Sequence, residues 1–240
     1  GLDGYAKRMP HELSGGQQQR VQLARSLVLE SDILLLDEPL ASLDAKLRKD
    51  MCIELKRLQE RIGITFIHVT HNQEEAMTIA DRIAVIADGR LVEEGSPRDI
   101  YERPRRRFTA DFVGENNVLE GRVTHVNGER LTVDAGFAAI DIIAPDAVPP
   151  VGSVVALSIR SEHLKLLPDG GDPPDGTQCI PATYLEEVYL GLTTMHLVRL
   201  PNGDEVTVRR LSEDSAGPGV AADQPVQLGW QTRAARLHID

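Results

Sequence analysis

Two adjacent carboxylates, Asp37 and Glu38, follow the apolar run Ile33–Leu36. A short continuous apolar run is typical of a strand that is buried on both faces of a parallel sheet. Ligands of such sheets bind beyond the carboxyl ends of the strands. Asp37 could hold Mg²⁺ directly or through water, and Glu38 could orient and deprotonate a water that attacks a γ-phosphate. The alternative is that both carboxylates are charges that face solvent at a strand end.

A second group of residues surrounds a predicted helix start. Ser14 is a good N-cap, and Gln17 can close a capping box with it. Gly15 and Gly16 remove side chains where the helix begins, so that free backbone N–H groups and the positive end of the helix dipole suit a phosphate. An ordinary capped helix is the alternative.

Asp44 and His71 are the remaining candidates. Asp44 closes the segment Ala41–Asp44, where it is either a helix N-cap or part of a loop between two protomers. His71 follows a predicted strand and could hydrogen-bond a γ-phosphate, although a lone histidine is more often structural. His68 is expected to be structural, because its spacing to His71 places the two side chains on opposite faces of a strand.

The elements that must position these side chains alternate between strand-like and helix-like periods over about residues 1–95. This alternation predicts an α/β domain with a parallel sheet. Asn72 and Glu75 resemble a capping box, and Asp88–Gly89 predicts a hairpin turn. The expected elements are a helix around 21–28, strands at 33–36, 64–69 and 83–87, and a helix over 47–62 that Gly63 stops.

The second half has a different pattern, in which short β-rich runs are separated by turn signals. It predicts an all-β domain, a small barrel, with the segment 170–176 as a loop and Trp230 packed inside. Before it, Ser96–Pro97 starts a short helix, and Arg105–Arg107 is expected to be a solvated helix end. The strand candidates are 132–133, 154–159, 195–200 and 206–208.

Composition narrows the possible classes of protein. The chain has 240 residues, a net charge of −11 and 41% apolar residues, which fits one or two folded domains and argues against general nucleic-acid binding. Its two cysteines, Cys52 and Cys179, cannot form a disulfide framework or a zinc site by themselves. No apolar run reaches the roughly 18 residues of a membrane-spanning helix. Motifs begin within a dozen residues of Gly1, so we expect the chain to be a fragment of a longer protein.

Taken together, four motifs resemble the ATP-binding cassette family of ATPases. Leu13–Arg20 (LSGGQQQR) is similar to the family's signature motif, and Ile33–Pro39 (ILLLDEP) to its Walker B strand with the catalytic glutamate. Ala41–Asp44 (ASLD) is similar to its D-loop, and His71 to its switch histidine. The order and spacing of the motifs agree with the family, and the ATPase resemblance covers about residues 1–113.

The remainder resembles the TOBE-type, OB-like regulatory domain of importer ATPases, which gives domains 1–113 and 114–240. The stretches Ile100–Pro104 and Phe112–Glu115 are similar to the junction in that subgroup, and Ile159–Glu162 and Leu228–Trp230 to landmarks of its polyamine-importer-like branch. The family's P-loop, G-x-x-x-x-G-K-[ST], does not occur in the 240 residues, and neither does its Q-loop. The resemblance therefore implies a partial P-loop NTPase fold, inactive alone.

The resemblance also implies the mechanism and the partners. Two cassettes, as a homodimer or a pair, close on ATP and Mg²⁺ with Glu38 as base, His71 as switch and Asp37 at the metal. The nucleotide-binding residues that it implies are Ser14, Gly15, Gly16, Gln17 and Asp44. Transmembrane permease subunits, fed by a solute-binding protein, would couple hydrolysis to uptake of a small solute, a polyamine by this resemblance. The protein would lie at the cytoplasmic face of the cell membrane.

Two other classes of function stay open at this point. One is a non-catalytic regulatory or interaction module, and the other is a soluble cassette ATPase that acts on nucleic acid or ribosomes. The acidic balance and the β-rich second half argue against the latter. A P-loop upstream of Gly1 would distinguish the transporter ATPase from the regulatory module.

Overall fold

The computed structural model describes residues 2, 4–28, 31–145, 147–170, 173–214 and 220–239. The chain divides into two compact units, which are described separately. The first unit contains residues 1–85 and 94–99, and the second contains residues 86–93 and 100–240. None of the helices in the described part of the chain is both long and apolar enough to span a bilayer.

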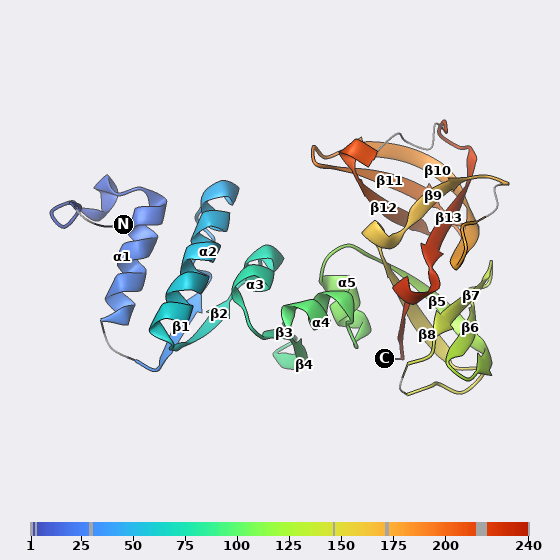
Figure 1. The fold of residues 1–240 in the computed structure, drawn as a ribbon, viewed down its shortest axis with the longest axis horizontal. Helices are drawn as coiled ribbons and strands as arrows, with labels where there is room; N and C mark the ends of the chain where they lie inside the picture. Colours follow the sequence, from blue (N-terminus) through green and yellow to red (C-terminus); the bar gives the residue numbers. More distant parts are fainter. Residues whose placement is uncertain are drawn as a thin grey trace. The chain divides into compact units, whose positions relative to one another are not determined.

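The first unit is an α/β arrangement, as the alternating pattern predicts (Figure 1). Its central part is a strand–helix–strand unit in which β1 and β2 pair in parallel, with Leu35 opposite Ile67. After a short 3₁₀ turn at Pro10–Glu12, its elements are α1 (Gly15–Leu27), β1 (Ile33–Asp37), α2 (Ala45–Ile62), β2 (Thr65–Val69) and α3 (Gln73–Ile79).

Capping residues determine where helix α2 of this unit begins and ends. The Asp44 carboxylate caps α2 by accepting a hydrogen bond from the Leu47 N–H at 3.0 Å. Gly63 ends α2 in the left-handed region, with φ of 75°, which a residue without a side chain adopts at little cost. The predicted stop at Gly63 is therefore confirmed.

The core of the first unit lies on one side of the β1–β2 pair. Leu34 on β1 packs with Met51 and Leu55 of α2, and these side chains are at most 8% exposed. On the other side, Leu35 and Ile67 remain 71% and 48% exposed. The prediction that β1 is buried on both faces is therefore wrong for this chain, because its described helices cover only one face of a two-stranded sheet.

A hairpin follows α3. Strands β3 (Ile83–Ala87) and β4 (Arg90–Gly95) pair through the predicted turn, whose residues Asp88 and Gly89 have φ of 49° and 72°. Positive φ at both turn positions gives the tight turn that matches the twist of the flanking strands. Two short helices come next, α4 (Pro97–Glu102) and α5 (Arg107–Phe112).

The second half of the chain is all-β, as predicted. Its strands form two five-stranded antiparallel sheets, in the orders β12-β11-β10-β13-β9 and β14-β8-β5-β6-β7. The strands are β5 (Asn116–Asn127), β6 (Arg130–Asp134), β7 (Ala139–Ile143), β8 (Val154–Arg160), β9 (Lys165–Pro168), β10 (Thr177–Tyr189), β11 (Thr193–Arg199), β12 (Glu205–Leu211), β13 (Pro225–Gln231) and β14 (Arg236–His238). Three 3₁₀ turns accompany them, Ser161–His163, Ser212–Asp214 and Thr232–Ala234.

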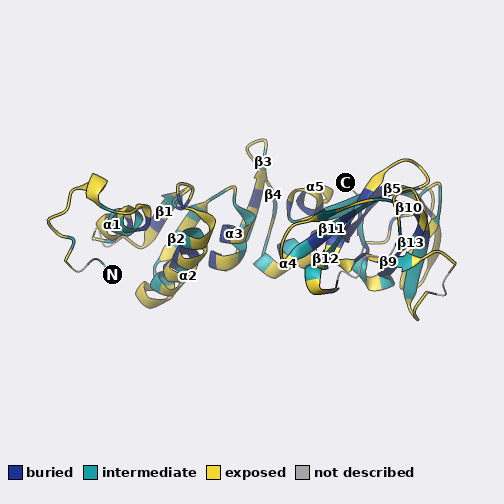
Figure 2. Cartoon of the chain, turned by 90° about the horizontal axis from the view of Figure 1, so that it is seen from above, coloured by how far each residue is buried: buried dark blue, intermediate teal, exposed yellow. Residues whose placement is uncertain are grey.

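One hydrophobic core joins the two sheets (Figure 2). Leu157 and Ile142 of one sheet and Val208 and Leu228 of the other are almost completely buried in it. Trp230 belongs to the same core and is 1% exposed, which agrees with the packing role expected of it. The predicted loop 170–176 lies partly outside the described residues, since positions 171 and 172 are not described.

Residues 100–113 associate with the β half through Arg160, the last residue of β8. Its guanidinium donates to the carbonyl oxygens of Tyr101 and Val113. Neither compact unit therefore ends between residues 113 and 114, and the family-domain boundary expected there stays a prediction. The Arg105–Arg107 run is exposed but lies at the start of α5, where the N–H groups of Arg105 and Arg106 donate to the Glu93 carboxylate.

Candidate functional site

The carboxyl ends of β1 and β2 bring Glu38 and His71 together. Glu38 has a left-handed backbone, with φ of 41°, and its N–H donates to the Val69 carbonyl at 2.9 Å. Its Oε1 lies 2.7 Å from Nδ1 of His71. Both side chains are open to solvent, at 46% and 75% exposure. A non-glycine residue held at positive φ is strained, and such strain is common at functional sites.

This hydrogen bond fixes the proton positions on His71. An ionised carboxylate only accepts, so Nδ1 of His71 carries the hydrogen that Glu38 receives. In the neutral ring Nε2 is then an acceptor, and it can donate to an anion only when the ring is an imidazolium.

Asp37 is the neighbouring candidate for a metal ligand. It ends β1 with an exposed carboxylate that has no hydrogen bond or ion pair to any described residue. No group of three or more His, Cys, Asp and Glu side chains with metal-binding geometry occurs among the described residues. A single exposed carboxylate is compatible with Mg²⁺, which takes one or two protein carboxylates and completes its shell with water and phosphate oxygens, and the role of Asp37 as a metal ligand stays a prediction.

The start of α1 has the predicted capping box. Oγ of Ser14 accepts from the Gln17 N–H at 3.4 Å, and Oε1 of Gln17 accepts from the Ser14 N–H at 3.0 Å. The Gln18 N–H is used by the Ser14 carbonyl. Helix geometry leaves the N–H groups of Gly15 and Gly16 as the donors of the first turn. Ser14 and Gly15 are exposed, and anion binding at this helix start stays a prediction.

The two glycines also let α1 approach the start of α2. A Cβ on Gly15 would lie 3.2 Å from a methyl group of Leu43, and one on Gly16 would lie 3.2 Å from a methyl group of Leu47. Gly16 is buried by this packing, whereas Gly15 is exposed. The structure thus brings the helix starts at Ser14 and Asp44 together.

The candidates therefore form two groups in the first unit. Glu38 and His71 are in direct contact, with Asp37 next in sequence, and the helix starts at Ser14 and Asp44 form the other group. Within the described part of the chain, no hydrogen bond or ion pair joins Ser14 to Glu38 or His71.

Sequence reasoning missed Glu75, which was predicted only as part of a capping box. Asn72 does cap α3 by accepting from the Glu75 N–H at 3.1 Å. However, the Asn72 N–H donates to Oγ1 of Thr70, and the Glu75 carboxylate turns inward to Thr70, His68 and Arg48. The box does not close because the carboxylate instead contacts the partly buried Thr70 hydroxyl, the His68 imidazole and the Arg48 guanidinium. A threonine immediately before the candidate histidine was the available signal.

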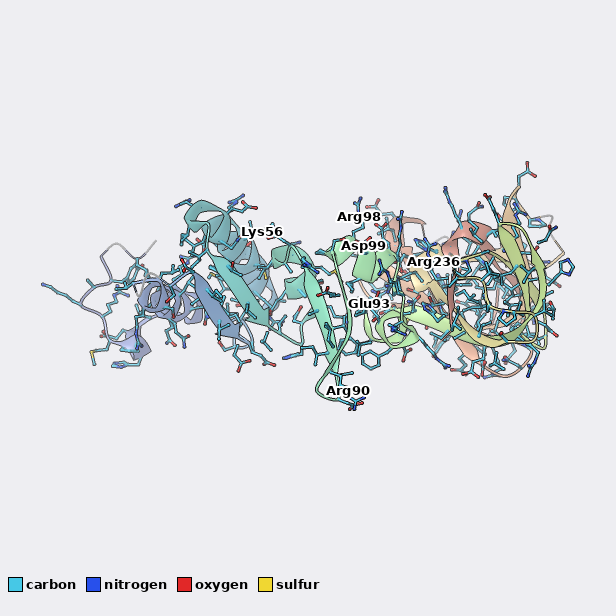
Figure 3. The ribbon with its side chains drawn as sticks, turned by 90° about the horizontal axis from the view of Figure 1, so that it is seen from below. Lys56, Arg90, Glu93, Arg98, Asp99 and Arg236 are labelled. Carbon is cyan, nitrogen blue, oxygen red and sulfur yellow. The ribbon has the colours of Figure 1, made fainter. Side chains whose placement is uncertain are left out.

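A basic pocket of about 30 Å³ lies in the β-rich unit, and its lining includes Arg160, Arg233, Arg236, His163 and Glu102. Figure 3 labels Arg236 in this unit. Burial lowers the pKa of Arg236, and the charge of Arg103 acts in the same direction. Burial also lowers the pKa of Arg160, whose donors are used by backbone carbonyls.

Comparisons with known proteins agree with the two-part organisation. Residues 1–41 match the family model described as ABC transporter, and residues 157–237 match the TOBE domain. The spermidine/putrescine import ATP-binding protein PotA of Rubrobacter xylanophilus is 44% identical over 234 residues, which cover 97% of this chain and 60% of the relative. The protein of the same description from Mesorhizobium japonicum is 46% identical over 241 residues, covering 100% of this chain and 64% of the relative. The chain is homologous to the import ATP-binding proteins of ABC transporters.

The predicted fold classes are thereby confirmed, an ABC ATPase segment and an all-β TOBE domain. The chain spans less than two thirds of the length of these curated relatives. A solved structure of the cytoplasmic molybdate-binding protein ModG aligns with 53% of this chain and 99% of its own, with a TM-score of 0.46 and 15% identity.

Proposed function

We propose that this chain forms part of the ATP-hydrolysing subunit of an ABC importer that energises uptake of a polyamine. The observation that carries the proposal is the 2.7 Å contact between Glu38 and His71 at the strand ends of an ABC ATPase segment. The choice of solute is supported by the relatives, whose names state spermidine and putrescine import. In this role the protein would lie peripherally at the cytoplasmic face of the membrane.

In the proposed reaction, Glu38 acts as the general base. Its carboxylate takes a proton from the attacking water, whose oxygen forms a bond to the γ-phosphorus while the bond to the ADP oxygen breaks. His71 holds Oε1 of Glu38, which orients the carboxylate toward the water. When its ring is an imidazolium, Nε2 can donate to a γ-phosphate oxygen, so His71 links the base to the presence of nucleotide.

Asp37 would hold Mg²⁺, which neutralises phosphate charge when it is bound. Its carboxylate is exposed and has no partner among the described residues, so it would not have to leave a hydrogen bond or ion pair to any of them. The Gly15 N–H and the Ser14 hydroxyl would bind phosphate oxygens of ATP held mainly by a second subunit. In this proposal a second cassette pairs with the first, and permease subunits with a solute-binding protein would complete the transporter.

The test uses a chimaera in which the P-loop-bearing N-terminal segment of the Rubrobacter xylanophilus relative precedes residues 1–240. A bacterial strain that lacks its own polyamine-import ATPase receives this chimaera together with the relative's permease subunits and solute-binding protein. We expect it to restore uptake of labelled spermidine, and we expect the Glu38→Gln variant to abolish that uptake. Glu54→Gln is the matched control, because Glu54 is an exposed carboxylate on α2 whose ion pair among the described residues is with Arg20. Equal uptake by the chimaera and its Glu38→Gln variant would contradict the proposal.

A further inference from the structure

The Glu75 carboxylate, at the first turn of α3, is buried beside the loop that contains His71. The residue is 2% exposed, although a carboxylate is expensive to bury unless it is paired and hydrogen-bonded. Its neighbour Glu74 has the same chemistry and is exposed. The burial of Glu75 is therefore explained by its surroundings in the fold and not by its residue type.

Three side chains compensate the buried charge. Oε2 of Glu75 accepts from Oγ1 of Thr70 at 2.8 Å and lies 3.4 Å from Nε2 of His68. Its Oε1 lies 3.5 Å from Nε of Arg48, which comes from α2. Burial lowers the pKa of His68, and Glu75 opposes this shift. Three elements, α2, β2 and α3, thus meet at one carboxylate.

The contact with Thr70 determines the conformation of the next two residues. The Thr70 hydroxyl donates its hydrogen to Glu75 and accepts from the Asn72 N–H at 2.9 Å. His71 lies between these two residues in sequence, so its backbone is fixed on both sides. The Asn72 side chain closes the ring by accepting from the Glu75 N–H at 3.1 Å.

The fixed backbone is what presents His71 to Glu38. The His71 side chain is 75% exposed and has its hydrogen bond to Glu38 as the contact that orients it. An exposed imidazole on a loose turn would sample many positions, and that sampling would weaken the 2.7 Å contact. Glu75 limits the movement of His71 by fixing the backbone of the loop, and it does not contact the imidazole ring of His71.

We propose that Glu75 is a positioning residue, which acts through the Thr70 hydroxyl to hold His71 against Glu38. The claim that Glu75 fixes the position of His71 rests on the hydrogen bonds alone. The claim that this affects ATP hydrolysis also rests on the proposed function. Glu75 does not contact Glu38 or His71 directly, so its effect on chemistry passes through the loop geometry.

The first test measures hydrogen exchange of the Asn72 amide in the full 240-residue chain. Glu75→Gln and Thr70→Val should each speed this exchange by at least about fivefold, as expected when a hydrogen bond is lost or loosened. Glu74→Gln is the matched control and should leave the rate unchanged. Unchanged exchange in Thr70→Val would overturn the structural part, because that variant keeps the shape of threonine and removes only the hydroxyl.

The second test measures steady-state ATP hydrolysis by the chimaera described above. Thr70→Val and Glu75→Gln should lower kcat by about 10- to 100-fold, the scale of a small misplacement of a catalytic group, with KM for ATP changed less than about twofold. Thr70→Ser retains the hydroxyl and should keep kcat close to that of the unsubstituted chimaera. A loss of thermal stability in Thr70→Val with unchanged kcat would show that the network is structural only. A chimaera without any ATPase activity would contradict the proposed function, and the exchange experiment would still decide the hydrogen-bond network.

Discussion

The guanidinium of Arg160 lies 3.9 Å from the ring centre of Tyr101, and the same group donates to the carbonyl oxygen of Tyr101. The Tyr101 hydroxyl in turn donates to Oε1 of Glu162 at 2.8 Å. Burial raises the pKa of Tyr101, and the hydrogen bond to Glu162 adds to that rise. A cation, an aromatic face and a carboxylate thus connect the end of α4 to the end of β8.

Replacing Arg160 by Lys should destabilise the β-rich unit. Lysine retains the charge but cannot donate from a planar fork to the Tyr101 and Val113 carbonyls at once. We expect a loss of about 1.5–3 kcal/mol in the free energy of unfolding, measured in urea by Trp230 fluorescence. Arg199→Lys is the control, because Arg199 is an exposed partner of Glu205 and should change stability by less than about 0.5 kcal/mol. An equal loss in both variants would contradict this account.

A segment that retains Tyr101 should be more stable than one that does not. Residues 100–240 contain both carbonyls that accept from Arg160, whereas residues 115–240 leave its buried guanidinium without them. Both segments should show β-type circular dichroism and a blue-shifted Trp230 emission that ATP does not change. The longer segment should melt at least about 5 °C higher, the scale of 1 kcal/mol in a small domain. If 115–240 is as stable as 100–240, the Arg160 contacts contribute little.

Gly114→Ala should lower the free energy of unfolding through both backbone strain and overpacking, and a control variant separates the two effects. Gly114 has φ of 75°, and an added Cβ would lie 2.4 Å from Nη1 of Arg160 and 2.8 Å from Cε2 of Tyr101. Gly203 has φ of 94° with no atom within 4 Å of an added Cβ. We expect Gly203→Ala to cost about 1 kcal/mol and Gly114→Ala about 1–3 kcal/mol more in urea unfolding, because it adds overpacking to backbone strain. Similar costs at both positions would mean that the Arg160 side chain moves aside freely.

In the chimaera, Glu38→Gln should lower the turnover number for ATP by roughly two to four orders of magnitude, the usual contribution of a general base. Nucleotide binding should persist, since glutamine retains a hydrogen-bonding side chain next to His71. Steady-state turnover and retention of labelled ATP on the protein measure the two effects. The 240-residue chain by itself should not hydrolyse ATP at a useful rate, because it contains no P-loop motif. Turnover near that of the unsubstituted chimaera would exclude Glu38 as the base.

Ser14→Arg should block pairing of two subunits while each one still binds ATP. A bulky side chain at the start of α1 fills the space where the donors of Ser14 and Gly15 would meet a phosphate of the second subunit. Size-exclusion chromatography of the chimaera with ATP should show loss of the dimer, and equilibrium dialysis should show retained ATP binding. Ser26→Arg, at the other end of α1, should still dimerise. Loss of ATP binding by the monomer would show that Ser14 acts within its own subunit.

Local signals predicted much of this molecule. The caps at Ser14 and Asp44, the stop at Gly63 and the turn at Asp88–Gly89 all depend on residues at most three positions apart, so a linear pattern contains them. The candidate site residues were chosen from the order and spacing of four motifs, and their roles stay predictions.

The features that the sequence did not predict depend on distant partners. Arg160 ends an apolar strand, and nothing near it in sequence indicates that its acceptors are the Tyr101 and Val113 carbonyls. Glu75 has a valid local role as a cap partner, and only the fold shows that Thr70 and Arg48 draw its carboxylate inward. Solvent exposure of Leu35 likewise depends on what covers the sheet, which an apolar run does not specify.

The position of β13 in its sheet has a consequence for synthesis of the protein. This strand is near the end of the chain, yet it lies between β9 and β10 and carries Trp230 into the core. Until the ribosome has released residues 225–231, the facing edges of β9 and β10 have unpaired backbone groups and the core lacks its largest side chain. The nascent β half is therefore exposed to aggregation and proteolysis until β13 has been translated and has paired. A premature stop codon shortly before Pro225 would remove a central strand and leave a product that cells degrade.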